Sequence, residues 1–118
     1  MGVRRIVANI ATDRIDEARA FYGELLGLQP VMDHGWIMTL AGDGVARPQV
    51  SFASEGGSGT PVPDLSIEVD DLDAVLQRAR AMGLPLEHGP AREPWGVRRF
   101  FVRDPLGRLL NILVHEEP

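Results

Sequence analysis

Residues 10–18 read IATDRIDEA and residues 67–75 read IEVDDLDAV, and these two stretches decide the fold. Each is a short apolar strand, an acidic cap and the start of an amphipathic helix, which runs on to Gly27-Leu28 in one copy and Gly83-Leu84 in the other. A repeat of this kind sets the architecture of a whole chain. The sequence therefore predicts two copies of one module, with a functional cleft where the copies face each other.

The length and composition are those of one globular domain. The chain has 118 residues, of which 44% are hydrophobic and 25% charged, and these shares are ordinary for a globular protein. Half of such a chain would be marginally stable alone. We therefore expect the halves to share a core or to exchange partners in a homodimer.

Charge and cysteine content exclude several function classes. The net charge of −5 argues against nucleic-acid binding, which needs clustered lysine and arginine. The absence of cysteine excludes disulfides, thiolate metal sites and cysteine nucleophiles. No apolar run is long enough to span a membrane, and the N-terminus lacks the apolar core of a signal peptide. A cytoplasmic protein is expected. The acidic surface either favours a cationic ligand or simply keeps the protein soluble.

The first module is predicted over residues 3–55. A strand at 3–11 leads to Asp13, which we expect to cap a helix together with Asp16. The helix ends at Gly27 in a left-handed conformation. Its apolar stripe, with Phe21 at the edge, consists of Ile15, Ala18, Tyr22, Leu25 and Leu26. Strands are predicted at 28–34, 35–41 and 48–54.

The second module is predicted over residues 64–115, after a flexible connector at 56–63. A strand at 64–70 leads to a helix capped by Asp70 and Asp73, with an apolar stripe of Leu72, Val75, Leu76, Ala79 and Met82 and a stop at Gly83. Strands follow near 85–88, at 97–103 and at 108–115, and residues 104–107 (DPLG) match a type I turn.

The predicted fold class is α+β. The element order is βαβββ twice, which gives two tandem modules that form curved mixed sheets around a cleft, with the helices on the outer face.

Two longer stretches resemble a known family. Residues 18–28 (ARAFYGELLGL) are similar to the first-helix signature of the glyoxalase / bleomycin resistance / extradiol dioxygenase superfamily, also called vicinal oxygen chelate proteins. Residues 95–112 (WGVRRFFVRDPLGRLLNI) resemble the closing hairpin of its bleomycin-resistance-like members. The resemblance spans nearly the whole chain and implies the fold. It does not choose a function, because this fold hosts lyases, epimerases, dioxygenases, transferases and drug-binding proteins.

The resemblance also implies where a metal site would lie. Metal-dependent relatives use four histidine or glutamate ligands from the first and last strands of each module, and these positions fall on Ile6, Gln49, Asp64 (or a neighbour) and Asn111. One carboxylate and two amides are a poor donor set for a divalent ion. His34, His88 and His115 are expected in a turn, a loose segment and a strand end, solvated rather than ligating. We therefore expect no metal and no cofactor, which argues against glyoxalase I, dioxygenase and fosfomycin-transferase activity.

Strand alternation predicts which side chains line the cleft. Phe100 and Val102 should face the helices, which turns Arg99 and Phe101 toward the cleft. Arg98 belongs to the other set and could pair with Glu93, although a bulge would exchange the two arginines. The remaining lining residues are expected to be Ile6, Ala8, Ile10, Gln49, Ser51, Asn111 and Leu113.

Three further residues keep two interpretations each. Trp95, on a proline-flanked loop, either stacks on a planar ligand at the cleft rim or covers the core. Trp36 is expected in core or edge packing. Asp64 is either a desolvated base or, more simply, a turn carboxylate. No Ser-His-Asp order, HExxH motif or spaced carboxylate pair is present, so catalytic residues are not assigned.

These observations predict a metal-free small-molecule-binding protein that sequesters a planar or partly cationic, antibiotic-like ligand. The predicted ligand-binding residues are Ile6, Gln49, Ser51, Asp64, Trp95, Arg99, Phe101 and Asn111. One alternative is a lyase or isomerase that recruits a weak metal through Asp64 or works without one. Another is an accessory domain with no ligand of its own. Metal analysis separates the first two hypotheses.

Overall fold

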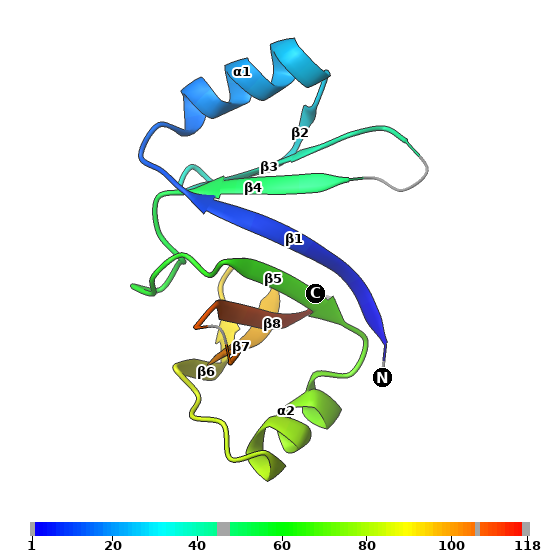
Figure 1. Ribbon diagram of the computed structural model, residues 1–118, viewed down its shortest axis with the longest axis vertical. Coiled ribbons are helices and arrows are strands. Elements are labelled where there is room, and N and C mark those ends of the chain that lie inside the picture. The colour runs from blue at the N-terminus through cyan, green and yellow to red at the C-terminus, as the bar shows by residue number, and fades with distance from the viewer. Residues whose placement is uncertain (1, 45–47, 106, 117–118) are drawn as a thin grey trace. The chain divides into compact units, whose positions relative to one another are not determined.

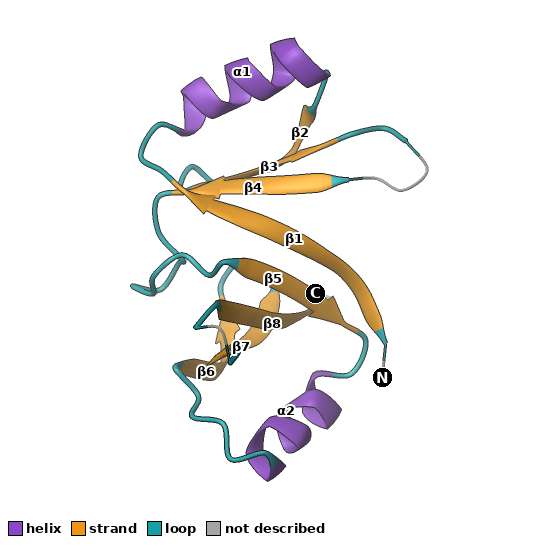
Figure 2. Ribbon diagram, in the orientation of Figure 1, coloured by secondary structure: helices purple, strands orange, loops and turns teal. Residues whose placement is uncertain are grey.

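The computed structural model describes residues 2–44, 48–105 and 107–116. The elements follow the order βαβββ twice, so the α+β class is confirmed (Figures 1 and 2). Their bounds are β1 Val3–Ala11, α1 Ile15–Leu26, β2 Gln29–Asp33, β3 Ile37–Ala41, β4 Gln49–Ala53, β5 Leu65–Val69, α2 Leu72–Ala81, β6 His88–Glu93, β7 Val97–Arg103 and β8 Leu109–His115. Among the described residues, neither helix has the length and hydropathy needed to cross a membrane.

The chain forms two compact units. The N-terminal unit is Val7–Val62, and the C-terminal unit combines the residues up to Ile6 with those from Pro63 onward. The hydrogen-bonded strand order is β2-β3-β4-β1 in the first and β5-β8-β7-β6 in the second. In each unit one pair is parallel, β1 with β4 and β5 with β8, and the neighbouring pairs are antiparallel. The prediction of mixed sheets is therefore confirmed.

The C-terminal unit has the larger core. Helix α2 buries Leu72, Leu76 and Ala79 against one face of the sheet, where Phe100 is fully buried. The helix begins as a capped helix should, but the cap differs from the predicted Asp70: the Asp71 carboxylate accepts a 3.1 Å hydrogen bond from the Ala74 N–H.

The N-terminal unit has a smaller core of Met38, Leu40 and Phe52, against which the α1 residues Ile15, Ala18 and Tyr22 pack. No residue of α1 is fully buried. Phe21, predicted at the edge of the apolar stripe, is 58% exposed, so its truncation should cost less than that of a fully buried phenylalanine, which is about 3 to 5 kcal/mol. Gly27 ends the helix with a φ of 71°, as predicted.

Capping of α1 also differs from the prediction. Asp13 is not the cap: the N-cap position is Arg14, which makes no side-chain cap bond. The Thr12 hydroxyl instead accepts a 3.0 Å hydrogen bond from the Arg14 N–H. The carboxylates nearest the helix start are Asp16 and Glu17 in the first turn, where they favour the positive end of the helix dipole.

The strand predicted near 85–88 lies later, at His88–Glu93. Gly89 and Pro90 read as turn residues in the sequence, yet they form an irregularity in the strand, where the register shifts between His88 and Ala91. Gly89 is required there, since its φ is 79° and a Cβ would lie 2.4 Å from the Arg99 carbonyl oxygen. The shift matters for function because it places His88 and Glu93 on a sheet.

Two connecting segments form hydrogen-bonded turns. The segment predicted as a flexible connector folds into a hydrogen-bonded turn, in which the Thr60 N–H donates to the Gly57 carbonyl at 3.0 Å. In the DPLG turn the Gly107 N–H donates to the Asp104 carbonyl at 3.0 Å, as a β-turn requires. Leu106 of this turn lies outside the described residues.

Candidate functional site

The sheet of the C-terminal unit has an apolar face and a polar face. Phe100, Val102 and Ile112 face α2, so alternation turns their neighbours to the opposite side. Cross-strand pairs fix the rows on that side: Ser66 lies beside Asn111, and Asn111 beside Phe101. We call this side the polar face; its members are Ser66, Glu68, His88, Glu93, Arg99, Phe101, Asn111, Leu113 and His115. The predicted facing of Arg99, Phe101 and Asn111 away from the helix is confirmed.

A buried ion pair is the main feature of the polar face. The Arg99 Nη2 atom lies 2.9 Å from the Glu93 Oε2 atom, and the two residues are only 2% and 8% exposed. The guanidinium also stacks on two rings, with its carbon 4.9 Å from the Trp95 centroid and 4.7 Å from that of Phe101. The sequence analysis proposed an ion pair between Glu93 and Arg98. That pairing is wrong, because Arg98 instead bonds Asp73 at 3.1 Å.

Burial and pairing act on Arg99 in opposite directions. Desolvation lowers the pKa of its guanidinium, and the negative charge of Glu93 raises it. The pKa stays lowered overall, so desolvation is the larger effect. A buried guanidinium without its counter-ion is strongly destabilising. Glu93 therefore fixes the position of Arg99, and through it the stack with Trp95.

His88 adds an imidazole to this cluster. Its Nε2 atom lies 3.6 Å from Glu93 Oε1, and its ring meets Phe101 edge-on at 5.2 Å between centroids. The Nε2 atom is buried and makes no hydrogen bond among the described residues. The expectation of a solvated His88 is wrong, because β6 begins at this residue and carries it into the sheet.

Asn111 presents an unused hydrogen-bond acceptor. Its Nδ2 atom donates to the Ser66 hydroxyl at 3.1 Å, which orients the amide. The Oδ1 atom is buried and accepts no hydrogen bond from any described residue. An unmade buried hydrogen bond costs about 1 to 3 kcal/mol, so this oxygen favours any small molecule that brings an N–H or O–H donor to it.

A second charged group lies at the other end of the polar face. The Glu68 carboxylate pairs with Arg5 at 2.9 Å and also contacts His115 Nδ1. Its side chain is 15% exposed. His115 is exposed at the end of β8, as predicted, and the Glu68 carboxylate holds its ring.

Asp64 has a structural role in the turn before β5. Its Oδ2 atom accepts a 2.8 Å hydrogen bond from the Leu109 N–H, and its own N–H donates to the Leu109 carbonyl at 2.8 Å. Arg108 lies 3.8 Å from the other carboxylate oxygen. These contacts tie β5 to β8 and support the interpretation as a turn carboxylate over that as a desolvated base.

The N-terminal unit carries a neutral counterpart of the polar face. Ser51 and Thr39 are buried and their hydroxyls lie 2.7 Å apart. Gln49 and Ser51 lie on the side away from α1, as predicted, since Val50 and Phe52 pack toward it. Trp36, just before β3, stacks with His34 at 6.3 Å between centroids, which fits edge packing.

The alternation predicted for β1 is wrong. Ala8 pairs with Val50 and Ile10 with Phe52, so both lie on the α1 side of the sheet, and Asn9 lies beside Ser51 instead. Apolar residues at even positions suggested a cleft lining, but the same pattern is expected for a strand that packs on a helix. Ile6, of the same parity, is 57% exposed. Its part in ligand binding stays a prediction.

Comparison with known proteins gives the family. The model of the Glyoxalase/Bleomycin resistance protein/Dioxygenase superfamily matches residues 4–112, nearly the whole chain. The chain belongs to this superfamily. No curated relative matches the sequence.

Several solved structures share the fold. Methylmalonyl-CoA epimerase from Mycobacterium tuberculosis is 23% identical, with a TM-score of 0.64 over 99% of this chain and 89% of the epimerase. A superfamily member from Vibrio splendidus 12B01 is 19% identical, with a TM-score of 0.66 over 97% and 99%. NAD-dependent benzaldehyde dehydrogenase from Legionella pneumophila is 14% identical, with a TM-score of 0.76 over 95% of this chain and 100% of the dehydrogenase chain. Identities this low establish the fold alone.

The superfamily's metal chemistry can be tested against the donor set of this chain. Ile6 offers no donor atom, Gln49 and Asn111 offer amides, and the Asp64 carboxylate already accepts a backbone hydrogen bond. Among the described residues, no group of three histidine, cysteine or acidic side chains is arranged to hold an ion. These four positions do not fit a divalent cation, which requires charged or imidazole ligands.

Sequence reasoning missed three functional candidates, Glu93, His88 and Glu68. Glu93 and His88 were missed because the strand that carries them was predicted near 85–88 instead of at His88–Glu93. Glu68 was not considered. The signal for Glu68 was available, because it lies two residues after Ser66 and therefore shares the face of Asn111.

Proposed function

We propose that this superfamily member binds a small organic molecule on the polar face and sequesters it, without a resident metal ion. The observation that carries this proposal is the buried, unused Oδ1 atom of Asn111. Binding sites are mostly apolar with a few well-placed polar groups, and here Phe101 and Leu113 flank Asn111. The ligand class that fits is a planar molecule with an N–H or O–H donor, which the amide oxygen would orient.

Arg99 and Trp95 support the same ligand class. Their stack forms a flat group on the same sheet face as Asn111, and a planar molecule gains from stacking on such a surface. Because Glu93 neutralises Arg99, the site has no strong preference for an anion. The proposal also includes ligand binding by Ile6 and by Gln49 and Ser51 of the N-terminal unit. It further includes assembly into a homodimer.

The test combines metal analysis with a ligand screen. The purified protein should contain no stoichiometric zinc, nickel, iron or manganese, and a panel of planar antibiotics should include compounds that raise its melting temperature. Asn111→Leu should abolish the shift, whereas Gln77→Leu, which removes an exposed amide from α2, should keep it. A stoichiometric transition metal, or an equal shift in the Asn111 variant, would contradict the proposal.

A second candidate function is metal-independent isomerisation, and one observation favours it. Glu93, which is buried, and His88, which is partly buried, form a carboxylate–imidazole pair on the polar face, the kind of group that removes a proton from a carbon acid. Methylmalonyl-CoA epimerases are among the proteins of similar fold. In this reaction a base would take the proton next to a thioester carbonyl and a proton would return on the other side.

Deuterium exchange distinguishes the two functions. Incubation of methylmalonyl-CoA with the protein in D₂O should exchange the α-proton if the isomerase function holds, and His88→Gln should slow the exchange. His34→Gln is the matched control, since His34 lies in the other unit. Absence of exchange in the wild type excludes this activity on that thioester and leaves sequestration as the proposal.

A further inference from the structure

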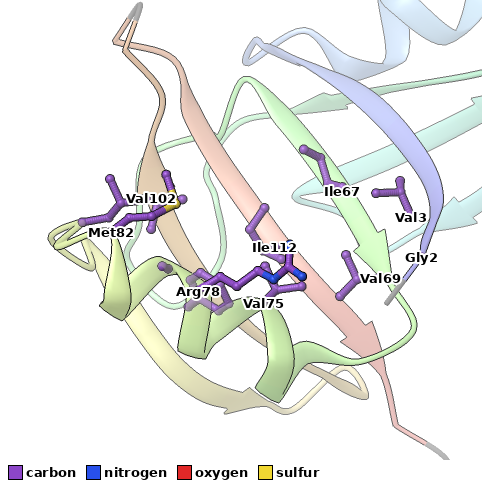
Figure 3. A pocket seen from close by; sticks show the side chains of 12 residues that line it. Gly2, Val3, Ile67, Val69, Val75, Arg78, Met82, Val102 and Ile112 are labelled. Atoms are coloured by element: carbon purple, nitrogen blue, oxygen red, sulfur yellow. The ribbon is translucent and has the colours of Figure 1, made fainter.

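The second face of the same sheet has a pocket of its own. It lies between α2 and the α2-facing sides of β5, β7 and β8, has a volume of about 350 Å³, and is bounded by Gly2 and Val3 at its far end (Figure 3). Pockets of roughly 300 Å³ and above are large enough for small ligands. None of the polar-face residues lines it, so it is distinct from the site described above.

The pocket exists because α2 does not cover its sheet completely. Ala79 is buried at the centre of the contact, but its side chain is small. Met82, at the end of the helix, is 71% exposed, and Val3 on the opposite wall is 60% exposed. Apolar walls are thereby left open to water, and each Å² of them that a ligand covers contributes roughly 25 cal/mol.

Arg78 is the one charged residue among the described residues that line the pocket. Figure 3 shows its side chain reaching from α2 across the pocket, with the guanidinium on the side of Val69, while Met82 and Val102 lie toward the other end. Within the described chain Arg78 makes no ion pair or hydrogen bond through its side chain. The guanidinium therefore has its donors free for a ligand, in a fork that matches a carboxylate.

The nearby acidic groups do not compete for Arg78. Asp70 accepts the Gly2 N–H at 2.6 Å, and Asp73 pairs with Arg98 at 3.1 Å. The described lining residues thus place one cation, Arg78, above an apolar cavity. We propose that this pocket binds an unbranched aliphatic monocarboxylate, with its chain against the β5, β7 and β8 side chains and its carboxylate on Arg78.

Decanoate is the probe that tests this proposal. Isothermal titration of the whole protein should show saturable binding of one decanoate per chain, below its micellar concentration. Within the series from hexanoate to decanoate, each added pair of methylene groups should strengthen binding roughly ten-fold. Decanol should bind roughly ten-fold more weakly than decanoate, because it lacks the charge-assisted hydrogen bonds to Arg78.

Matched variants locate the site. Arg78→Gln should weaken decanoate binding roughly ten-fold, and Arg80→Gln, an exposed arginine of the same helix that does not line the pocket, should leave it unchanged. Val75→Phe should block the chain by filling the cavity. Circular dichroism and thermal unfolding check that each variant folds, and Val75→Phe is read only if it does.

Three results would overturn the proposal: no saturable decanoate binding by the wild type, equal binding by the Arg78 and Arg80 variants, or affinity independent of chain length. Loss of decanoate binding in Asn111→Leu would also contradict it, since that residue belongs to the polar face. The outcome is therefore independent of whether the polar face binds its own ligand.

Discussion

The two helices of the duplicated module start from the same sequence pattern and end in different environments. Helix α2 buries Leu72, Leu76 and Ala79, whereas α1 buries no residue completely, and Leu25 and Leu26 are 63% and 61% exposed. Amphipathic periodicity therefore predicted both helices but not how much of each stripe is covered. That depends on the opposing sheet, which offers Phe100, Val102 and Ile112 to α2.

The sheet faces away from the helices differ more. In the N-terminal unit this side carries the neutral Thr39–Ser51 pair, and in the C-terminal unit it carries the buried Arg99–Glu93 pair. A repeat thus preserves the path of the chain, because the core pattern is needed twice, while the opposite face is free to diverge. In this protein the charged chemistry of the two faces is concentrated in the C-terminal copy.

The largest expected effect concerns the polar pairs. Glu93→Gln should destabilise the protein by about 3 to 5 kcal/mol, because it leaves the Arg99 guanidinium buried without its counter-ion. Thr39→Val in the other unit should cost only about 1 kcal/mol. Urea unfolding of both variants measures the difference. Restoration of stability in Glu93→Gln/Arg99→Met would confirm the cause, and equal costs for the two single variants would remove the contrast between the units.

The next effect concerns the helix cores. Leu76→Ala should cost about 3 kcal/mol, since Leu76 is 8% exposed and its removal leaves a cavity. Leu25→Ala on α1 should change stability by less than about 0.5 kcal/mol, because that side chain is mostly exposed. Guanidinium unfolding of the two variants provides the measurement. A large loss in Leu25→Ala would mean that α1 is covered in solution, for example by a second copy.

A smaller effect should separate the helix starts. Asp71→Ala removes the N-cap bond of α2 and should cost about 1 kcal/mol. Asp13→Ala, one residue before the N-cap position of α1, should cost less, since the N-cap residue there is Arg14 and no side chain caps the helix. Thermal unfolding of both variants is the measurement. Equal losses would show that Asp13 caps the helix as the sequence suggests.

The smallest effect is a pH dependence in the C-terminal unit. The hydrogen bond from the Gly2 N–H lowers the pKa of the Asp70 carboxyl from its ordinary 3.8. A lowered folded-state pKa gives stability that is present above the ordinary value and is lost as the pH falls through the lowered one. The stability difference between wild type and Asp70→Asn should therefore shrink on acidification below 3.8. A difference that stays constant through this range would show that the bond does not form.

Sequence reasoning predicted the fold well where side-chain periodicity and turn chemistry agree. Phe100 and Val102 alternate with Arg99 and Phe101, and β7 follows that alternation. It failed at β1, where an apolar face looks the same whether it meets a helix or a ligand. It failed again at β6, because Gly89 and Pro90 are residues typical of turns and the strand was therefore not predicted at His88–Glu93. The positions of His88 and Glu93 on the sheet were missed for the same reason.

The candidate site was predictable only in part. The sequence indicated the facing of Arg99 and Asn111, because alternation fixes it. It could not indicate the partner of Arg99, since the register of β6 against β7 depends on the conformation of the loop between Glu93 and Val97. The orientation of the Asn111 amide depends in the same way on a non-local neighbour, Ser66.

Strand β1 has a consequence for dissecting the protein. Its first residues belong with the C-terminal unit, where the Asp70 N–H donates to the Gly2 carbonyl at 3.0 Å and Arg5 pairs with Glu68 at 2.9 Å, while its later residues pair with β4. A C-terminal fragment that begins at the repeat boundary near Pro63 would lack these first residues of β1. The backbone of β5 would then be exposed as a sheet edge, which promotes pairing with other chains and aggregation. The boundary between the two sequence repeats does not coincide with the boundary between the two compact units. Split or permuted versions should therefore be cut elsewhere.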